Sequence, residues 1–396
     1  MKIALVCPAS LPATQFGGIL FLAVDIAKEL GEKSHKTTIF TTNLDFANNP
    51  HTFNKNLPHI EKKETFEINR SKVWFHHELF YINPKMYFEI KNYKPDIIHT
   101  IGVRSFQSFI ASLVSKYHKI PLIISDQGGL TTHPDLKQGG IIKKILYFLQ
   151  NPIIKFIVNQ SSKIIVANEY EKKIFEKLAD NSKISIVKNG IDLKFVKNSD
   201  DNFKDKYKIE NDFILFLGRF SKVKGIDNLI QAWNIIKSKN LSPKIKLIIM
   251  GVDFGFQDEM LKMIDQMNLS NDIIIIKKPP REDVFAAYKA CLFLVLPSRW
   301  ELSPLTPLEG FAFKKTSIST IAHGIPYTLT DKENAILVEP ENYNHLSDAI
   351  YNLINNKNLR DNLANNGYRL VQDECNSTKM AENVLKIYED TLDSAK

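Results

Sequence analysis

Short apolar runs alternate with amphipathic stretches along most of this 396-residue chain. Runs of this kind read as buried strands, and the stretches between them carry apolar residues at helical spacing. One such stretch, GILFLAVDIAKEL, begins at Gly18, and the tail contains two or three amphipathic helices, the last near 378–393. The pattern predicts an α/β protein with parallel, doubly wound sheets. The expected strands are KIALVCP, TTIFTTN, DIIHT, LIISD and KIIVAN, then FILFLGRF, KLIIMG, DIIIIKK, LFLVLPS and TSIST.

A polar, charged segment without an apolar period, 196–211, interrupts this alternation. We expect it to be a linker between a first domain, 1–195, and a second domain, 212–376, with a cleft between them. The chain is long enough for two cores of ordinary size.

Composition narrows the class of protein. Hydrophobic residues make up 44% and charged residues 24% of the chain, as in soluble globular proteins. Cys7, Cys291 and Cys375 lie far apart, which indicates reduced thiols in a cytoplasmic protein. The apolar core of the amino terminus is too short for an export signal, and no run is long enough to span a membrane.

The formal charge of +8 indicates an acidic partner. Zinc-finger spacing and RNA-binding motifs are absent from the sequence, so we expect no nucleic acid. The stretch 139–160 joins apolar residues at helical spacing to Lys143, Lys144 and Lys155. It reads either as a basic helix on the anionic inner face of a membrane or as a helix with a solvated lysine face.

Two carboxylates stand eight positions apart in ELSPLTPLEG. Glu301 follows the apolar run CLFLVLPSRW, and Glu309 begins what reads as a helix, EGFAF. Acids at a strand-to-helix passage can face one ligand, because open α/β sheets bind ligands at the carboxyl ends of their strands. Taken alone, this spacing is more often that of two unrelated surface residues.

The segment FLGRFSKVKGIDNLIQAW places Arg219 and Lys224 after another apolar strand, with Gly218 and Gly225 beside them. A planar guanidinium, a mobile ammonium and a helix start suit a diphosphate, and glycine lets the backbone approach it. The alternative is an ordinary basic loop before an amphipathic helix.

Weaker candidates lie in the first half. Gly17 and Gly18 separate the first strand from the first helix, where backbone amides can meet an anion, although no dinucleotide fingerprint is present. His99 ends the strand DIIHT, and Asn189 follows KISIVK. A structural histidine and an Asn-Gly turn are the alternatives for the last two.

Taken in order, six segments resemble the retaining GT-B glycosyltransferases of the family 4 type (glycosyl transferases group 1). The resemblance covers nearly the whole chain and implies two Rossmann-like domains, the second holding a sugar-nucleotide donor. It also implies that the last helix, 377–396, packs back on the N-terminal domain. The segments are FGGILFLAVDIAKEL, KPDIIHT, KISIVKNGID, LGRFSKVKGIDNLIQAW, PSRWELSPLTPLEGFAF and ENAILVEPENYNHLSDAI.

The resemblance also implies roles for single residues. Arg219 and Lys224 would grip the donor diphosphate and offset charge on the leaving nucleoside diphosphate. Glu301 would lie against the transferred sugar, and Glu309 would bind the ribose hydroxyls. The remaining donor-binding residues would be Gly17, Gly18, Gly218, Leu305 and Thr306.

The implied reaction moves a hexose from a nucleoside-diphosphate sugar to a glycan, a lipid-linked acceptor or another hydroxyl. It would retain the anomeric configuration by front-face attack and need no metal. A catalytically reduced protein that binds sugar nucleotide in a glycan-assembly complex is the alternative.

The sequence departs from the family pattern in three places. Asp126, Gln127 and Gly128 stand where many members carry a histidine, with His133 nearby. Asp126 and Gln127, together with His99 and Asn189, are the candidates for contacts with acceptor or sugar. Further on, FKKTSIST replaces the usual small-Gly-Lys-Pro stretch, and HGIPY carries Tyr327 in place of an acid.

Overall fold

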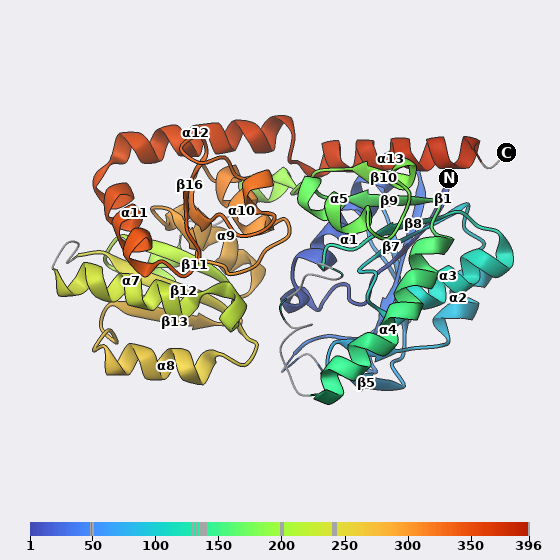
Figure 1. Ribbon diagram of the computed structural model, residues 1–396, viewed down its shortest axis with the longest axis horizontal. Helices are drawn as coiled ribbons and strands as arrows, with labels where there is room; N and C mark the ends of the chain where they lie inside the picture. The colour runs from blue at the N-terminus through green and yellow to red at the C-terminus, as the bar shows by residue number, and fades with distance from the viewer. Residues whose placement is uncertain are drawn as a thin grey trace. The chain divides into compact units, whose positions relative to one another are not determined.

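The computed structural model describes residues 1–47, 49, 51–128, 130, 134, 141–198, 202–239 and 244–394. The chain divides into two compact units, which are treated separately below (Figure 1). The first unit comprises Met1–Gly190 and Ser377–Lys396, and the second comprises Ile191–Asn376. The last helix therefore belongs to the unit formed by the N-terminal half of the chain.

The first unit is built on an 8-stranded sheet of order β10-β9-β8-β7-β1-β2-β4-β3. All its neighbouring strands are parallel except β3 and β4. The strands are β1 (Lys2–Val6), β2 (Lys36–Thr42), β3 (Ile60–Lys62), β4 (Glu67–Ser71), β7 (Ile97–Ile101), β8 (Leu122–Ser125), β9 (Lys163–Val166) and β10 (Ile184–Ile186); β5 (Phe75–His77) and β6 (Phe80–Ile82) form a separate hairpin.

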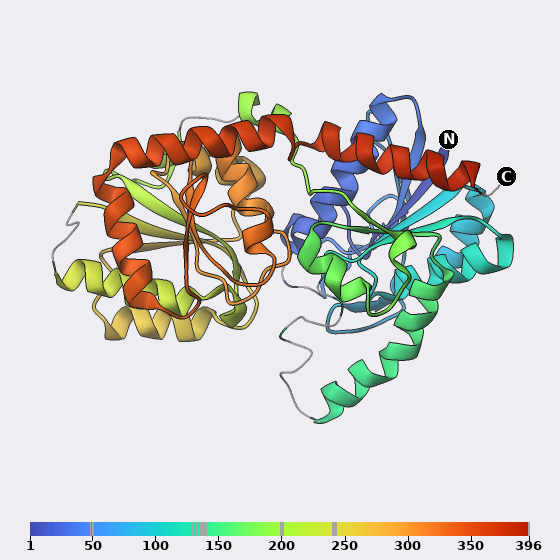
Figure 2. The same cartoon turned by 45° about the horizontal axis from the view of Figure 1, so that its top comes forward.

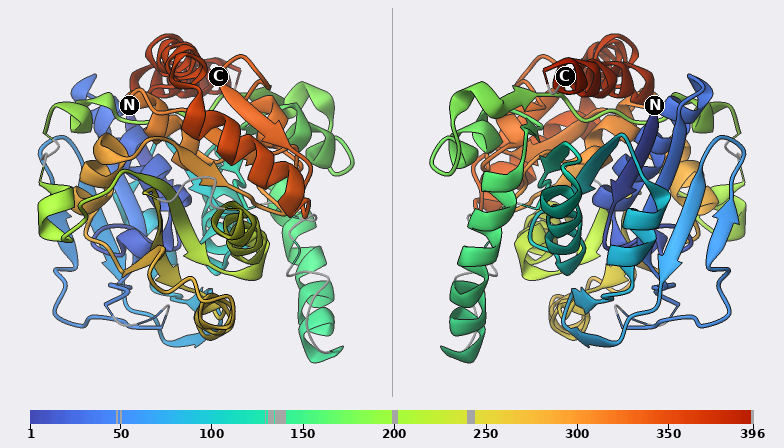
Figure 3. Two further views of the ribbon diagram at one scale, coloured as in Figure 1. Left: turned by 90° about the vertical axis from the view of Figure 1, so that its left-hand side faces the viewer. Right: turned by 90° about the vertical axis from the view of Figure 1, so that its right-hand side faces the viewer.

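Helices cover both faces of this sheet, which is why its central strands are continuous apolar runs. One face packs against α2, α3 and α4, and the right-hand view of Figure 3 shows α2 beside α3. The other face carries α1, against which α13 packs. In Figure 2, α4 extends away from the rest of the unit. The helices are α1 (Gly18–Glu32), α2 (Met86–Tyr93), α3 (Phe106–His118), α4 (Ile141–Gln160), α5 (Glu169–Phe175) and α13 (Ser377–Asp393).

The second unit contains a 6-stranded parallel sheet of order β13-β12-β11-β14-β15-β16. One face packs against α7, α8 and α11 and the other against α6 and α9; the left-hand view of Figure 3 shows α7 and α8. The strands are β11 (Phe213–Phe220), β12 (Lys246–Asp253), β13 (Ile273–Lys277), β14 (Leu294–Leu296), β15 (Ser317–Thr320) and β16 (Ala335–Val338). The helices are α6 (Phe203–Lys206), α7 (Ile226–Ser238), α8 (Gln257–Gln266), α9 (Arg281–Ala290), α10 (Leu305–Ala312), α11 (Tyr343–Asn355) and α12 (Lys357–Asp373).

Each of the ten apolar runs contains a strand, whereas the short strands β3 to β6, β10 and β16 were not foreseen. The structure differs from the prediction that 196–211 is a linker between the two domains. Phe203 and Ile209 are buried in the core of the second unit, and that unit begins earlier, at Ile191. Two apolar residues, Phe203 in the short helix α6 and Ile209 just after it, are enough to anchor this polar segment to the core.

Candidate active site

Glu301 lies in the loop that follows β14, at the carboxyl edge of the second unit's sheet. Its side chain is nearly buried, and its Oε1 atom accepts hydrogen bonds from the Lys224 ammonium and from the Ser298 hydroxyl, the latter at 2.9 Å. Hydrogen bonds fix the loop on both sides of Glu301. Thr320 donates to the Ser298 carbonyl at 2.6 Å, and the Gly324 amide donates to the Glu301 carbonyl at 3.0 Å. The carboxylate is therefore held in one orientation.

Lys224 comes from the passage between β11 and α7. This passage is a short 3-10 helix, Lys222–Lys224, followed by Gly225 in the left-handed region at φ 68°. A Cβ atom on Gly225 would lie 2.0 Å from the Pro297 carbonyl oxygen, so only glycine fits. The close approach of this turn to the loop after β14 brings Lys224 to Glu301.

Arg299 links the turn that carries Lys224 to the loop that carries Glu301. Its guanidinium forms a two-pronged ion pair with Asp227, at 2.7 and 2.8 Å, and donates to the Lys222 carbonyl at 2.6 Å. Its backbone amide donates to the Val223 carbonyl at 2.8 Å. A bidentate Arg–carboxylate pair fixes geometry as well as adding energy. Arg299 thus sets the position of the Lys224 turn relative to Glu301.

Arg219 lies at the carboxyl end of β11, with its guanidinium 4.5 Å from the centre of the Phe254 ring. Gly218 precedes it and pairs in register with Gly251 of β12. The structure therefore keeps Arg219 and Lys224 in one strand-to-helix passage, as the sequence indicated.

Glu309 lies within α10, which begins at Leu305, so the expectation that Glu309 starts the helix was wrong. The residue is 5% exposed, and its carboxylate accepts hydrogen bonds from Arg281 and from the Tyr288 hydroxyl, the latter at 2.7 Å. Burial, followed by the charge of Glu309, raises the pKa of Tyr288 well above its ordinary value. Tyr288 therefore remains a hydrogen-bond donor to Glu309 at neutral pH.

The second unit thus assembles cations and carboxylates at one edge of its sheet. Leu305 and Thr306 form the first turn of α10, where helix geometry leaves backbone N–H groups without partners inside the helix. Such amides together with Arg219 and Lys224 suit an anionic ligand, whereas Glu301 and Glu309 suit its hydroxyl groups. Among the residues described, no group of three or more His, Cys, Asp or Glu is placed to hold a metal ion.

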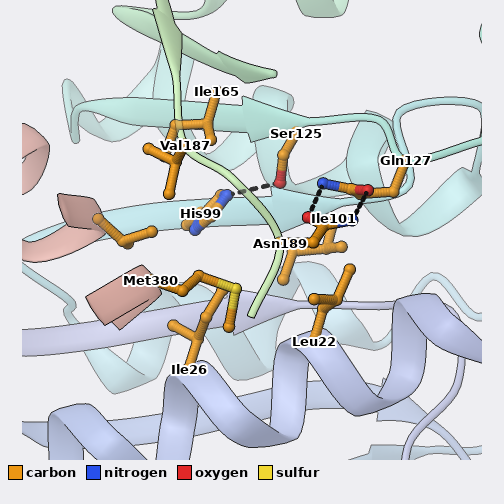
Figure 4. Close-up of a pocket in the computed structure, with 11 residues that line it drawn as sticks. Leu22, Ile26, His99, Ile101, Ser125, Gln127, Ile165, Val187, Asn189 and Met380 are labelled. Atoms are coloured by element: carbon orange, nitrogen blue, oxygen red, sulfur yellow. Dashed lines mark hydrogen bonds between the residues drawn. The ribbon is translucent and has the colours of Figure 1, made fainter. Parts of the chain in front are cut away.

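His99 does not fit the expected contact with acceptor or sugar. The side chain is 0% exposed and borders a cavity of about 20 Å³, which is lined largely by apolar residues, some of them from α1 and α13 (Figure 4). Its ring shares hydrogen bonds with Ser125 at 2.8 Å and with Tyr388 of α13 at 2.7 Å. Burial lowers the pKa of His99 to about 3, so the imidazole is neutral. It is a satisfied structural histidine that joins the last helix to the sheet.

The other candidates of the first unit also form hydrogen bonds within that unit. Asp126 is 2% exposed, and its Oδ2 atom accepts from the amides of Gly128 and Leu130. Gln127 and Asn189 form a reciprocal pair of amide hydrogen bonds, both 2.9 Å (Figure 4). Burial removes Asp126 from direct contact with a ligand, contrary to expectation, whereas Gln127 is only partly buried.

Gly17 and Gly18 occupy the expected turn. Gly17 has φ 99°, a conformation that favours glycine, and caps α1, whose first residue is Gly18. His133 lies outside the described residues, as do 139 and 140 of the basic stretch. The remainder of that stretch is the helix α4.

Sequence reasoning missed several residues of the site. Ser298 could have been found, because it lies two positions after the end of β14 and three positions before Glu301 in the run PSRWE. Arg281, Tyr288 and Arg299 carried none, because their roles depend on partners far away in sequence.

Comparison with known proteins agrees with this architecture. The model of the glycosyl transferases group 1 matches residues 198–370, and the model of Glycosyltransferase Family 4 matches residues 16–195. An uncharacterized glycosyltransferase of Methanocaldococcus jannaschii is 28% identical over 337 residues, which cover 77% of this chain and 88% of the relative. CapM, a capsular polysaccharide biosynthesis glycosyltransferase of Staphylococcus aureus, is 26% identical over 260 residues, covering 63% of this chain and 64% of CapM.

The fold is also that of solved glycosyltransferases. Anabaena HepE in complex with UDP and glucose superposes with a TM-score of 0.76 at 16% identity, covering 98% of this chain and 99% of HepE. Two α/β units with parallel sheets, together with this likeness, define the GT-B class of transferases. The two family models between them span most of the chain, and the protein belongs to the glycosyltransferases of group 1, of the family 4 type.

Proposed function

We propose that this glycosyltransferase moves a hexose from a nucleoside-diphosphate sugar to a hydroxyl of a glycan or lipid-linked acceptor, with retention of anomeric configuration. The observation that carries the proposal is the contact between Lys224 and Glu301 at the edge of the second unit's sheet. It pairs a cation suited to the leaving diphosphate with an anion suited to a sugar that gains positive charge in the transition state.

Lys224 and Glu301 are both useful because charges of opposite sign develop on the donor during the reaction. As the glycosidic bond to the diphosphate breaks, negative charge grows on the leaving oxygen and positive charge grows at the anomeric carbon. Lys224 and Arg219 would stabilise the first, and Glu301 would stabilise the second while accepting from sugar hydroxyls. In the free protein, Lys224 and Glu301 neutralise each other, so neither is left as an unpaired charge in a nearly buried place.

The nucleotide would lie along α10. The backbone amides of Leu305 and Thr306 suit the diphosphate, Gly218 would let the backbone approach it, and Glu309 suits the ribose hydroxyls. The structure of HepE with UDP and glucose makes UDP the first nucleotide to test. That Gly17 and Gly18 of the first unit contact the donor remains a prediction.

Retention by front-face attack needs no protein nucleophile, because the departing phosphate takes the acceptor proton. We propose that the reaction needs no metal, since Arg219 and Lys224 supply the positive charge that a metal supplies elsewhere. Among the first-unit candidates, Gln127 is only partly buried and remains a candidate for contact with acceptor or sugar. His99, Asp126 and Asn189 are withdrawn from that role because they are buried.

The test uses the purified protein with UDP-, GDP- and ADP-linked hexoses. A donor that binds the folded state raises the melting temperature. With that donor alone, we expect slow hydrolysis to nucleoside diphosphate and free hexose, unaffected by EDTA. When an acceptor hydroxyl is supplied, the glycoside formed should have the anomeric configuration of the donor, as read by NMR. If no sugar nucleotide raises the melting temperature or is turned over, the proposal is wrong. Binding without turnover would instead support the catalytically reduced protein.

We further propose that α4 contacts an anionic membrane surface. Lys155 is exposed on this helix, and Phe148 is 72% exposed, so a cation and an apolar side chain are both available to an anionic membrane surface. No helix in the described ranges is long and apolar enough to cross a membrane. Sedimentation with phosphatidylglycerol vesicles at low salt, lost in Phe148→Ser, would support surface binding. An absence of sedimentation would exclude it.

A further inference from the structure

Both oxygens of the Glu309 carboxylate have partners within the second unit. Arg281 donates from Nη2 to Oε1 and, at 3.4 Å, from Nη1 to Oε2, while the Tyr288 hydroxyl donates to Oε2 at 2.7 Å. Glu309 cannot be treated as an isolated acceptor that waits for a ribose. Its interaction with any nucleoside depends on how Arg281 and Tyr288 hold it.

Arg281 is itself held in place. Its side chain is 26% exposed, and its guanidinium lies 4.5 Å from the centre of the Phe285 ring, one turn further along α9. Phe285 in turn stacks on Phe195, with ring centres 4.3 Å apart and planes within 1° of parallel. An exposed surface ion pair carries little energy, but this guanidinium is positioned by an aromatic face and by a nearly buried carboxylate.

The Glu309 carboxylate can accept further hydrogen bonds beside those from Arg281 and Tyr288. An ionised carboxylate offers about four lone-pair directions. Arg281 and Tyr288 use three of them, and the weakest of the three is the Nη1 contact at 3.4 Å, beyond the usual hydrogen-bond range. One ribose hydroxyl can therefore be accepted at once, and a second can replace the Nη1 contact without breaking the stronger bond from Nη2.

We propose that Arg281 is a positioning residue for the ribose: it orients the Glu309 carboxylate so that the two hydroxyls of the donor nucleoside meet one vacant direction and one weakly used direction. The inference rests on the proposed binding of a sugar nucleotide by this unit. It assigns to Arg281 a part in recognising the diol of the nucleoside, and none in cleaving the bond to the sugar.

The experiment measures binding of UDP and of 2′,3′-dideoxy-UDP by calorimetry in the full chain. In Arg281→Ala, we expect UDP affinity to fall about ten- to a hundredfold, as for loss of a charge-assisted hydrogen bond, and dideoxy-UDP affinity to change less than about twofold. Turnover at saturating donor should change less than about threefold. In a Glu309→Ala background, Arg281→Ala should cause no further loss.

Lys289→Ala, at the far end of the same helix, is the matched control and should bind both nucleotides as the wild type does. If Arg281→Ala fails to fold, Arg281→Gln carries the same expectations. Equal weakening toward both nucleotides, or unchanged UDP affinity in a folded variant, would overturn the role of Arg281 alone. Failure of the wild type to bind UDP, GDP or ADP would overturn the proposed function and this inference together.

Discussion

The Lys224 ammonium and the Ser298 hydroxyl both donate to one oxygen of Glu301, so the second unit's central carboxylate is bound from two different loops. Lys224 arrives from the turn after β11, and Glu301 from the loop after β14. Because adjacent parallel strands end at the same edge of a sheet, two residues 77 positions apart meet there.

Replacing Lys224 with alanine tests the cation. We expect transfer to fall by about a hundred- to a thousandfold, as for removal of one donor that stabilises transition-state charge. Loss of a donor to the nearly buried Glu301 should also lower the free energy of unfolding by about 1–3 kcal/mol. Steady-state kinetics and chemical denaturation measure the two effects.

Lys222→Ala is the control for this variant, since Lys222 lies in the same turn but its side chain is 65% exposed. It should keep transfer within about twofold of the wild type, as surface substitutions usually do. Near-normal turnover in folded Lys224→Ala would remove the diphosphate assignment.

Arg299→Ala tests whether the position of the Lys224 turn matters. The variant loses the bidentate pair with Asp227 and the bond to the Lys222 carbonyl, so the turn should drift from Glu301. We expect kcat to fall by about tenfold or more, because misplacement of about 1 Å is costly in catalysis. Arg299→Lys should not restore it, since a lysine cannot form both bonds to Asp227.

A double-mutant cycle with Asp227→Asn separates this effect from general destabilisation. The two substitutions should be strongly non-additive in kcat because they break one interaction. Additive losses would mean that Arg299 acts independently of Asp227.

Gly225→Ala should be among the more damaging small substitutions in the second unit. The residue has φ 68°, and the new Cβ would overlap the Pro297 carbonyl oxygen at 2.0 Å. The left-handed conformation alone costs about 1–2 kcal/mol, and the overlap adds to it. We expect a loss of at least about 2 kcal/mol in the free energy of unfolding, measured by urea denaturation. Gly255→Ala, with φ 88° and nothing within 4 Å of its Cβ, controls for backbone strain without overlap.

Glu171 predicts a pH dependence of stability in the first unit. Burial, and then the charge of Asp126, raise the pKa of Glu171 from 4.5 to about 8, although the amides of Ala167 and Gln127 donate to it. The folded state therefore binds this proton more tightly than the unfolded state. The resulting stabilisation is present below pH 4.5 and is lost as the pH rises through about 8.

In Glu171→Gln, the free energy of unfolding should fall less steeply over this window than in the wild type. His99, whose pKa is lowered from 6.5 to about 3, contributes with the opposite sign: its stabilisation is present above 6.5 and is lost on acidification. Denaturation at a series of pH values isolates Glu171, since His99 is common to both proteins. Glu169→Gln, on the exposed side of the same helix, should follow the wild type, and an equally steep fall in Glu171→Gln would contradict the assignment.

The sequence by itself determined five strands of each sheet and the residues at their carboxyl ends. A buried parallel strand must be a continuous apolar run, and the polar residues that follow it must lie at one edge of the sheet. Arg219, Lys224 and Glu301 were accessible to this reasoning.

Only the tertiary structure decided which side chains meet and which are buried. His99 ends its strand like a functional residue, yet Tyr388, 289 positions away, packs over it from the last helix and removes it from solvent. Glu309 was expected to meet a ligand directly, yet Arg281 and Tyr288 of another helix already hold both its oxygens. Periodicity reports which face of an element a residue occupies, whereas partners and exposure depend on which distant elements pack there.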